Sequence, residues 1–199
     1  MKRNLLVTLI MMLVALTSGM KAMAASKQAY YVFNGGTLYF YYDKNYDSQE
    51  TKSKGLYGYY PLKETSPYWT SYKNQTVRVV FDSSFADYHP ENVQHMFDGC
   101  MNLIIIEGIE NLKTDKADSF EGMFVDCEKL QGTLNLSGWN TSKVTSFHHM
   151  FEDCYKLNGV NVSGWNTSKV TNVGRMFMRC VSLTELDLSS WDMSNVTEM

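Results

Sequence analysis

Apolar residues recur along the second half of the chain with the spacing of one helical face. In residues 144–157, Phe147, Met150, Phe151 and Cys154 fall at i, i+3, i+4 and i+7, which predicts an amphipathic α-helix with Thr145 as its N-cap. The same stripe occurs four times, with its methionines 27, 27 and 26 residues apart. Its members are Met96, Phe97, Cys100, Met123, Phe124, Cys127, Met150, Phe151, Cys154, Met176, Phe177 and Cys180. Four copies in register predict a repeat array.

A short strand and a turn complete each predicted unit. Each cysteine is followed by an alternation of apolar and polar residues typical of a strand, clearest at 157–162 and 183–188. The sequence Ser-Gly-Trp-Asn-Thr-Ser-Lys-Val-Thr occurs at 137–145 and 163–171, with a near copy at 189–197, and places an aromatic ladder at Trp139, Trp165 and Trp191. One unit buries too little apolar surface to fold alone, so the units are expected to stack. The predicted fold class is α/β, a solenoid of helix–strand units of about 26–27 residues.

The residues before the repeats predict a small, aromatic, β-rich cap. Two aromatic runs between residues 29 and 43 flank Asn34-Gly35-Gly36, a strong hairpin signal because these residues tolerate positive φ. Further strands are expected at 56–60 and 76–81. Twelve of the thirteen tyrosines lie before residue 90 and either fill the small sheet or form a stacking platform for sugars. We expect residues 25–75 to form this cap and residues 76–199 the array of about four units, which ends inside a repeat.

The first 24 residues predict a secretory signal peptide. Lys2 and Arg3 precede an apolar run, and Ala22-Met23-Ala24 supplies a small-residue cleavage site. Cleavage would change the net charge from −3 to about −6, because it removes three basic residues and no acids. An acidic exported chain is a poor match for nucleic acid, and no later stretch is long and apolar enough for membrane insertion. The predicted location is secreted or at the bacterial cell surface.

The repeat pattern resembles the BspA-type leucine-rich-repeat surface proteins of oral and gut bacteria. The resemblance covers roughly residues 76–199 and rests on Val-Thr-x-x-x-x-Met-Phe-x-x-Cys-x-x-Leu-x-x-Leu-x-Leu-Ser-x-Trp and on the segment 76–87 that leads into it. It implies a leucine-rich-repeat-like solenoid and a surface role, with binding to host matrix proteins or other cells. It supplies no catalytic residues. If the chain is bacterial, its six Asn-x-Ser/Thr triplets are turn caps rather than glycan sites.

The end of the sequence departs from this pattern. Thr197 takes the N-cap position of a fifth helix, so the sequence stops inside a repeat. An array needs its last face and strand edge covered. We expect either a longer chain or a partner on that face.

The four cysteines allow two readings. An even number in an exported chain is typical of two disulfides. Their equivalent positions on stacked helices, roughly 8–10 Å apart, instead favour a ladder of buried thiols, since a disulfide needs Cα atoms within about 7 Å.

His148, His149, Glu152 and Asp153 invite a metal or acid–base interpretation, but they lack the His-Glu-x-x-His spacing, and exposed polar positions are the favoured reading. No metal, cofactor or catalytic residue is expected.

The outward positions of the predicted strands form the candidate binding surface. The main candidates are Thr133, Asn135, Asn161, Glu185 and Asp187, with Gly159 in the third unit and Ile106 and Gly108 in the first. On adjacent strands these residues would make one polar face that contacts a protein ligand. The alternatives are a glycan-binding module that uses the tyrosine-rich cap, or a structural spacer of a longer surface protein. The protein is not expected to be an enzyme.

Overall fold

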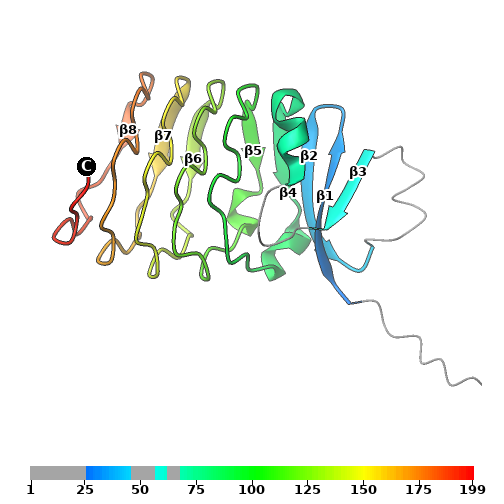
Figure 1. The fold of residues 1–199 in the computed structure, drawn as a ribbon, viewed down its shortest axis with the longest axis horizontal. Helices are drawn as coiled ribbons and strands as arrows, with labels where there is room; N and C mark the ends of the chain where they lie inside the picture. The colour runs from blue at the N-terminus through cyan, green and yellow to red at the C-terminus, as the bar shows by residue number, and fades with distance from the viewer. Residues whose placement is uncertain (1–25, 46–56, 62–67) are drawn as a thin grey trace, which may run out of the picture.

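The structure is a computed structural model that describes residues 26–45, 57–61 and 68–199. The predicted signal peptide, residues 1–24, lies outside these residues. A five-stranded sheet at one end has the order β3-β1-β2-β4-β5, and a three-stranded sheet continues the stack as β6-β7-β8 (Figure 1). The strands are β1 (Gln28–Asn34), β2 (Thr37–Asp43), β3 (Tyr57–Pro61), β4 (Arg78–Phe81), β5 (Ile105–Glu107), β6 (Gly132–Asn135), β7 (Leu157–Asn161) and β8 (Glu185–Leu186). Short 3-10 helices lie at η1 (Tyr68–Gln75), η2 (Ser83–Asp87) and η3 (Ile109–Asn111).

The predicted hairpin is confirmed. Strands β1 and β2 pair antiparallel from Gln28↔Asp43 to Asn34↔Thr37, and the turn holds Gly35 and Gly36 at φ 54° and 80°. Glycine fits here because it has no Cβ to oppose a positive φ. The expected strands at 56–60 and 76–81 correspond to β3 and β4. Strand β4 pairs parallel with both β2 and β5, so one sheet crosses the predicted boundary after residue 75.

The predicted α/β leucine-rich-repeat-like solenoid of helix–strand units is wrong. The described residues are β-rich, form one mixed and one parallel sheet, and contain no α-helix. Each stretch expected to be a helix is a run of tandem turns. We call these stretches the four turn segments: residues 93–100, 120–127, 147–154 and 173–180.

Left-handed residues explain why the turn segments are not helices. Each segment holds two residues at positive φ, four positions apart: His95 and Gly99, Gly122 and Asp126, His149 and Asp153, Arg175 and Arg179. A left-handed residue interrupts a right-handed helix and closes a turn instead. Within a segment, N–H groups bond three residues back, as Met150 does to Phe147 (3.1 Å) and Cys154 to Phe151 (3.2 Å). Thr145 caps no helix; its N–H donates to the Asp118 carbonyl in the preceding repeat.

Backbone hydrogen bonds between turn segments run in one direction. Alternate N–H groups of each segment donate to carbonyls of the next one, as Phe97 does to Met123, Phe124 to Met150 and Phe151 to Met176, each at 2.9 Å. Short parallel bridges at Ser119↔Ser146, Ser146↔Asn172 and Asn172↔Glu198 precede the same segments. The turn segments therefore present donors toward the C-terminal end of the stack and acceptors toward its beginning.

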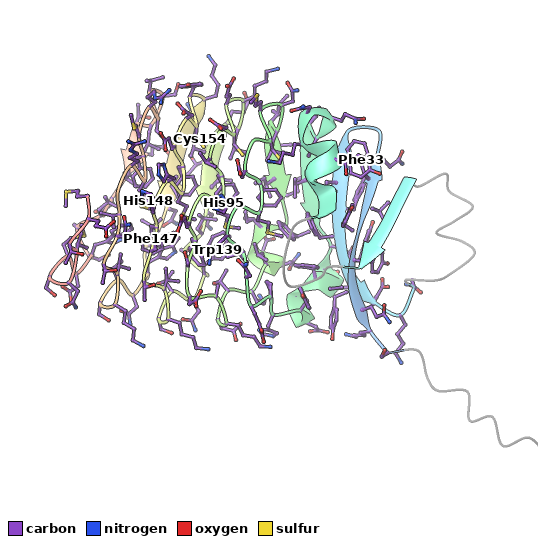
Figure 2. All side chains as sticks on the ribbon, viewed as in Figure 1. Phe33, His95, Trp139, Phe147, His148 and Cys154 are labelled. Carbon is purple, nitrogen blue, oxygen red and sulfur yellow. The ribbon has the colours of Figure 1, made fainter. Side chains whose placement is uncertain are left out.

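The inward positions expected from the sequence do form the core. Phe124, Phe151 and Phe177 stack with centroids 5.2 and 5.5 Å apart, and Trp139, Trp165 and Trp191 stack at 6.4 and 6.0 Å. Figure 2 shows Trp139, Phe147 and Cys154 among the side chains inside the stack, where each is at most 4% exposed. One cluster of buried residues runs from Ala29 to Met176. The division at residue 75 stays a prediction.

Candidate functional site

The outward residues of β6, β7 and β8 form one polar surface, which we call the strand face. Thr133, Asn135, Asn161, Glu185 and Asp187 are all exposed, while Leu134 and Val160 between them are buried. Parallel pairing sets Thr133 beside Gly159 and Asn135 beside Asn161, and then Gly159 beside Glu185. The alternation of a strand thus brings all five predicted residues together.

Two hydrogen bonds tie these side chains across the strands. Thr133 Oγ1 donates to Glu185 Oε2 at 2.9 Å, reaching over the intervening strand β7. The bond can form because residue 159 is glycine: a Cβ there would meet Glu185 Cβ at 2.8 Å and Thr133 Oγ1 at 2.9 Å. Asn161 Nδ2 donates to Asn135 Oδ1 at 3.1 Å. The strand face therefore holds its polar groups in fixed positions.

Backbone N–H groups in the turns after β7 and β8 hold two of these side chains in place. Asn161 Oδ1 accepts the Ser163 N–H at 3.1 Å, and Asp187 Oδ1 accepts the Ser189 N–H at 2.9 Å. The hydrogen bonds from Ser189 lower the pKa of the Asp187 carboxyl, because they favour its charged form. Asp187 is thus a fixed negative charge at the rim of the strand face.

An open pocket of about 560 Å³ lies at the C-terminal part of the strand face. Its lining includes four of the predicted residues, Thr133, Asn161, Glu185 and Asp187. Asn135 does not line the pocket, but it accepts a hydrogen bond from Asn161, which does. Sequence reasoning missed Ser163, Gly164, Ser189 and Ser190, which line the pocket from the turns after β7 and β8. These four residues belong to the repeated Ser-Gly-Trp motif and its near copy, and that repetition is the sequence feature that could have indicated them.

The expected outward residues of the first unit are wrong by one position. Ile106 is buried, and Gly108 is the N-cap of η3 at φ 67°, whereas Ile105 and Glu107 point outward. The pairing Val79↔Ile106 and Val80↔Glu107 fixes this register. Arg78 on β4 forms an ion pair with Glu107, in which Nε lies 2.9 Å from Oε1. This pair neutralises charge on β4 and β5, whereas Glu185 and Asp187 of the strand face form no ion pair with a described residue.

The four cysteines form the thiol ladder that the sequence favours. All four are free, and three are buried: Cys100, Cys127 and Cys154. The thiol of Cys127 donates to the Phe97 carbonyl (3.3 Å), Cys154 to Phe124 (3.2 Å) and Cys180 to Phe151 (3.0 Å). Burial raises the pKa of each thiol, to about 12 at Cys100 and about 11 at Cys180. The thiols of Cys127, Cys154 and Cys180 thus tie one repeat to the next, and the raised pKa of all four disfavours the thiolate form.

The acidic and basic side chains of the turn segments form an ion-pair cluster. Glu152, expected to be exposed, is buried and pairs with His149, and Arg179 lies 3.8 Å from Glu152 and 3.0 Å from Asp153. Asp153 is also buried, because both acids lie beneath the arginines of the fourth repeat. Among the described residues no group of His, Cys, Asp or Glu has the arrangement of a metal site. The cluster pairs charges within the stack.

The tyrosines of the first sheet form stacked pairs. Tyr39 and Tyr41 lie 6.3 Å apart at 16°, and Tyr41 stacks on the buried Tyr30 at 5.2 Å. Tyr39 and Tyr41 are half-buried on one face of β2. A ligand could reach these two rings.

Comparison with known families matches residues 91–199 to a family model described as "Mycoplasma protein of unknown function, DUF285". No curated protein and no solved structure matches the chain. Among the described residues, no helix is long and apolar enough to cross a membrane.

Proposed function

The chain belongs to the DUF285 family, and on that premise we propose that it is an exported or cell-surface adhesion protein that binds a protein ligand through the strand face. The predicted ligand is a host matrix protein or a protein on another cell. The finer resemblance to BspA-type surface proteins and the predicted signal peptide support the same role. No catalysis is proposed.

The observation that carries the proposal is the preorganised polar row on β6, β7 and β8. Its side chains are exposed, yet hydrogen bonds hold Thr133 to Glu185 and Asn161 to Asn135. A surface that is already ordered loses little side-chain entropy when a partner binds. The adjoining pocket of about 560 Å³ gives a partner side chain a place to enter.

Charge indicates which partner surface fits. Glu185 and Asp187 line the pocket, and no lysine or arginine is among its lining residues in the described part of the chain. Complementary charge steers a partner to its site and fixes its orientation more than it sets affinity. We therefore expect a lysine or arginine of the ligand to enter near β8.

The test is a binding screen of the purified protein against immobilised matrix proteins, followed by charge reversal. Glu185→Lys should reduce binding of a ligand found in the screen by at least about tenfold, because it places a positive charge in the pocket. Glu110→Lys is the matched control, since Glu110 is exposed on η3 outside the strand face. A ligand that binds both variants equally would contradict the proposal.

The stacked tyrosines support a second candidate, a glycan-binding module. The half-buried rings of Tyr39 and Tyr41 offer parallel faces to a sugar. Binding to a glycan panel that is lost in Tyr41→Ala and retained in Glu185→Lys would move the function to the first sheet. If neither the matrix-protein screen nor the glycan panel gives a ligand, the result would favour a structural spacer.

A further inference from the structure

Three lysines occupy the same exposed position in successive repeats, and we call them the lysine row: Lys116, Lys143 and Lys169. Each is the third residue of a four-residue turn. A backbone hydrogen bond from the fourth residue to the first closes these turns, at 3.0 Å in 114–117, 2.9 Å in 141–144 and 2.9 Å in 167–170. The row shares no residue with the strand face.

Contacts between the turns fix the spacing of the row. Thr114 Oγ1 donates to the Asn140 carbonyl of the next repeat at 3.1 Å. Thr141 Oγ1 donates in the same way to the Asn166 carbonyl at 3.0 Å. Neighbouring strands of a sheet lie about 4.7–4.9 Å apart. Successive lysines therefore follow one another along the stack at about this spacing.

The positive charge of the row is concentrated in its second and third members. Lys116 lies 3.8 Å from Glu91. Asp115 and Asp118 are close to it in the first unit. The second and third lysines form no ion pair with a described residue, and each is the only charged residue of its copy of Ser-Gly-Trp-Asn-Thr-Ser-Lys-Val-Thr.

The lysine row does not serve the stability of the stack. Like charges at neighbouring positions of adjacent strands repel and destabilise the fold. Lys143 and Lys169 make no hydrogen bond or ion pair with a described residue that would offset this repulsion. A repeated cost of this kind is accounted for if the charges bind a ligand that neutralises them.

Amide and hydroxyl groups flank these two lysines. Asn140 Oδ1 accepts the Ser142 N–H at 3.0 Å, which fixes the side-chain amide in the turn. Asn166 Oδ1 accepts the Ser168 N–H at 3.1 Å in the next repeat. The Nδ2 donors of both amides make no hydrogen bond to a described residue, so they are available to hydroxyl oxygens of a ligand.

The chemistry of the row selects one kind of polyanion. Lipid headgroups are usually bound by clusters of about four to eight basic residues. Single-stranded nucleic acid is usually bound with exposed aromatic side chains, whereas Trp139 and Trp165 in the same motifs are only 4% exposed. A polysaccharide with a carboxylate on each sugar has its charges about one strand spacing apart, and it offers hydroxyl groups to the amides. We propose that the lysine row binds such a linear acidic polysaccharide, with the polymer running along the stack from one repeat to the next.

The test is a titration of labelled oligogalacturonate with the full protein, followed by fluorescence anisotropy. The double variant Lys143→Gln, Lys169→Gln should bind the oligomer at least about tenfold more weakly than the unchanged protein, because it removes both uncompensated charges. The matched control is Lys129→Gln, Lys156→Gln. It also removes two exposed lysines from equivalent positions of successive repeats, in the segments after the cysteines, and it should bind as the unchanged protein does.

Equal weakening by the two double variants would overturn the proposal, because net charge would then determine the affinity. So would no binding of oligogalacturonate by the unchanged protein. Tighter binding to single-stranded DNA or to phosphatidylserine vesicles than to oligogalacturonate would also contradict it and would indicate another class of polyanion. Circular dichroism checks that both variants fold. Since the strand face is tested with other variants and other ligands, either site can fail alone.

Discussion

At the residue scale, the cysteines show how a sequence pattern can be right about position and incomplete about role. All four are expected as buried thiols; all four are free, but Cys180 is only half-buried while the other three are buried. The structure adds a donor role, because Cys154 reaches the Phe124 carbonyl of the preceding repeat at 3.2 Å. A sulfur–carbonyl contact between repeats depends on backbone conformation, which the spacing of residues does not reveal.

The raised thiol pKa values predict slow alkylation. Near about pH 8 very little thiolate is present when the pKa is about 12 or about 11, as at Cys100 and Cys180. Iodoacetamide should leave the native protein unlabelled and should label all four cysteines after unfolding in urea without reductant. Partial labelling should begin at Cys180, which is only half-buried. Mass spectrometry reads the result, and two disulfides would contradict the thiol ladder.

Asp126 predicts a pH dependence of stability. Burial, together with the neighbouring charges of Asp153 and Asp98, raises its carboxyl pKa above the ordinary value of 3.8. The charged form is thus disfavoured in the folded state, and a penalty develops as pH rises from 3.8 through the folded-state pKa. Asp126→Asn should therefore raise the free energy of unfolding at neutral pH. The gain should stay below about 1 kcal/mol, because solvent screens this partly exposed carboxyl, and asparagine also tolerates positive φ.

Urea unfolding of Asp126→Asn and of the unchanged protein at two pH values checks this prediction. The difference should be present at neutral pH and absent below 3.8, where both states bind the proton. If the variant is stabilised equally at both pH values, the effect comes from backbone conformation and not from the charge of Asp126.

At the element scale, the turn segments show where sequence reasoning succeeded and where it could not. The buried positions of the stripe were predicted correctly, because tandem turns with left-handed residues bury positions 93, 96, 97 and 100 just as a helix would. The backbone was predicted wrongly. Glycines at 99 and 122 were a hint, but His95, His149 and Arg175 adopt positive φ without being glycine. Stacking hydrogen bonds between repeats impose that conformation, and local preference does not.

The residues of the strand face were easier to predict than the backbone of the turn segments. Alternation along β6 and β7 determines which residues point outward whatever the rest of the repeat does. The outward residues of the first unit were predicted wrongly, because pairing with β4 sets the register of β5 and nothing in the repeat pattern reveals that pairing. The pocket itself is lined partly by turns beyond the strands, so only the structure could place it.

The effect of Gly99→Ala on the free energy of unfolding distinguishes a turn segment from a helix. In a helix interior, replacing glycine by alanine stabilises by roughly 0.5–1 kcal/mol. At φ 70° the same change should destabilise by about 1–2 kcal/mol, because a Cβ opposes the left-handed conformation. The nearest atom to that Cβ is Lys73 Nζ at 3.3 Å, the end of a flexible side chain, so the cost reports the backbone.

Gly138→Ala is the matched control. Gly138 has no positive φ, and a Cβ there would meet no atom within 4 Å. Its effect on the urea midpoint should be small or favourable. Stabilisation by Gly99→Ala as large as that by Gly138→Ala would argue for helical turn segments.

At the scale of the whole molecule, the stack separates two surfaces with different chemistry. The first sheet offers stacked tyrosines, and the strand face offers an ordered polar row with acids at and just after β8. These surfaces lie on different elements, so a ligand on one leaves the other free. A footprint on the folded protein can therefore identify the one that carries adhesion.

The most direct measurement is hydrogen–deuterium exchange of the protein with and without a matrix-protein ligand from the screen. Binding through the strand face predicts added protection in the peptides that contain β6, β7 and β8, with β1 and β2 unchanged. The protection at β8 should disappear in Glu185→Lys and persist in Glu110→Lys. Protection confined to β1 and β2 would contradict the strand face as the adhesive surface and place the ligand on the tyrosines.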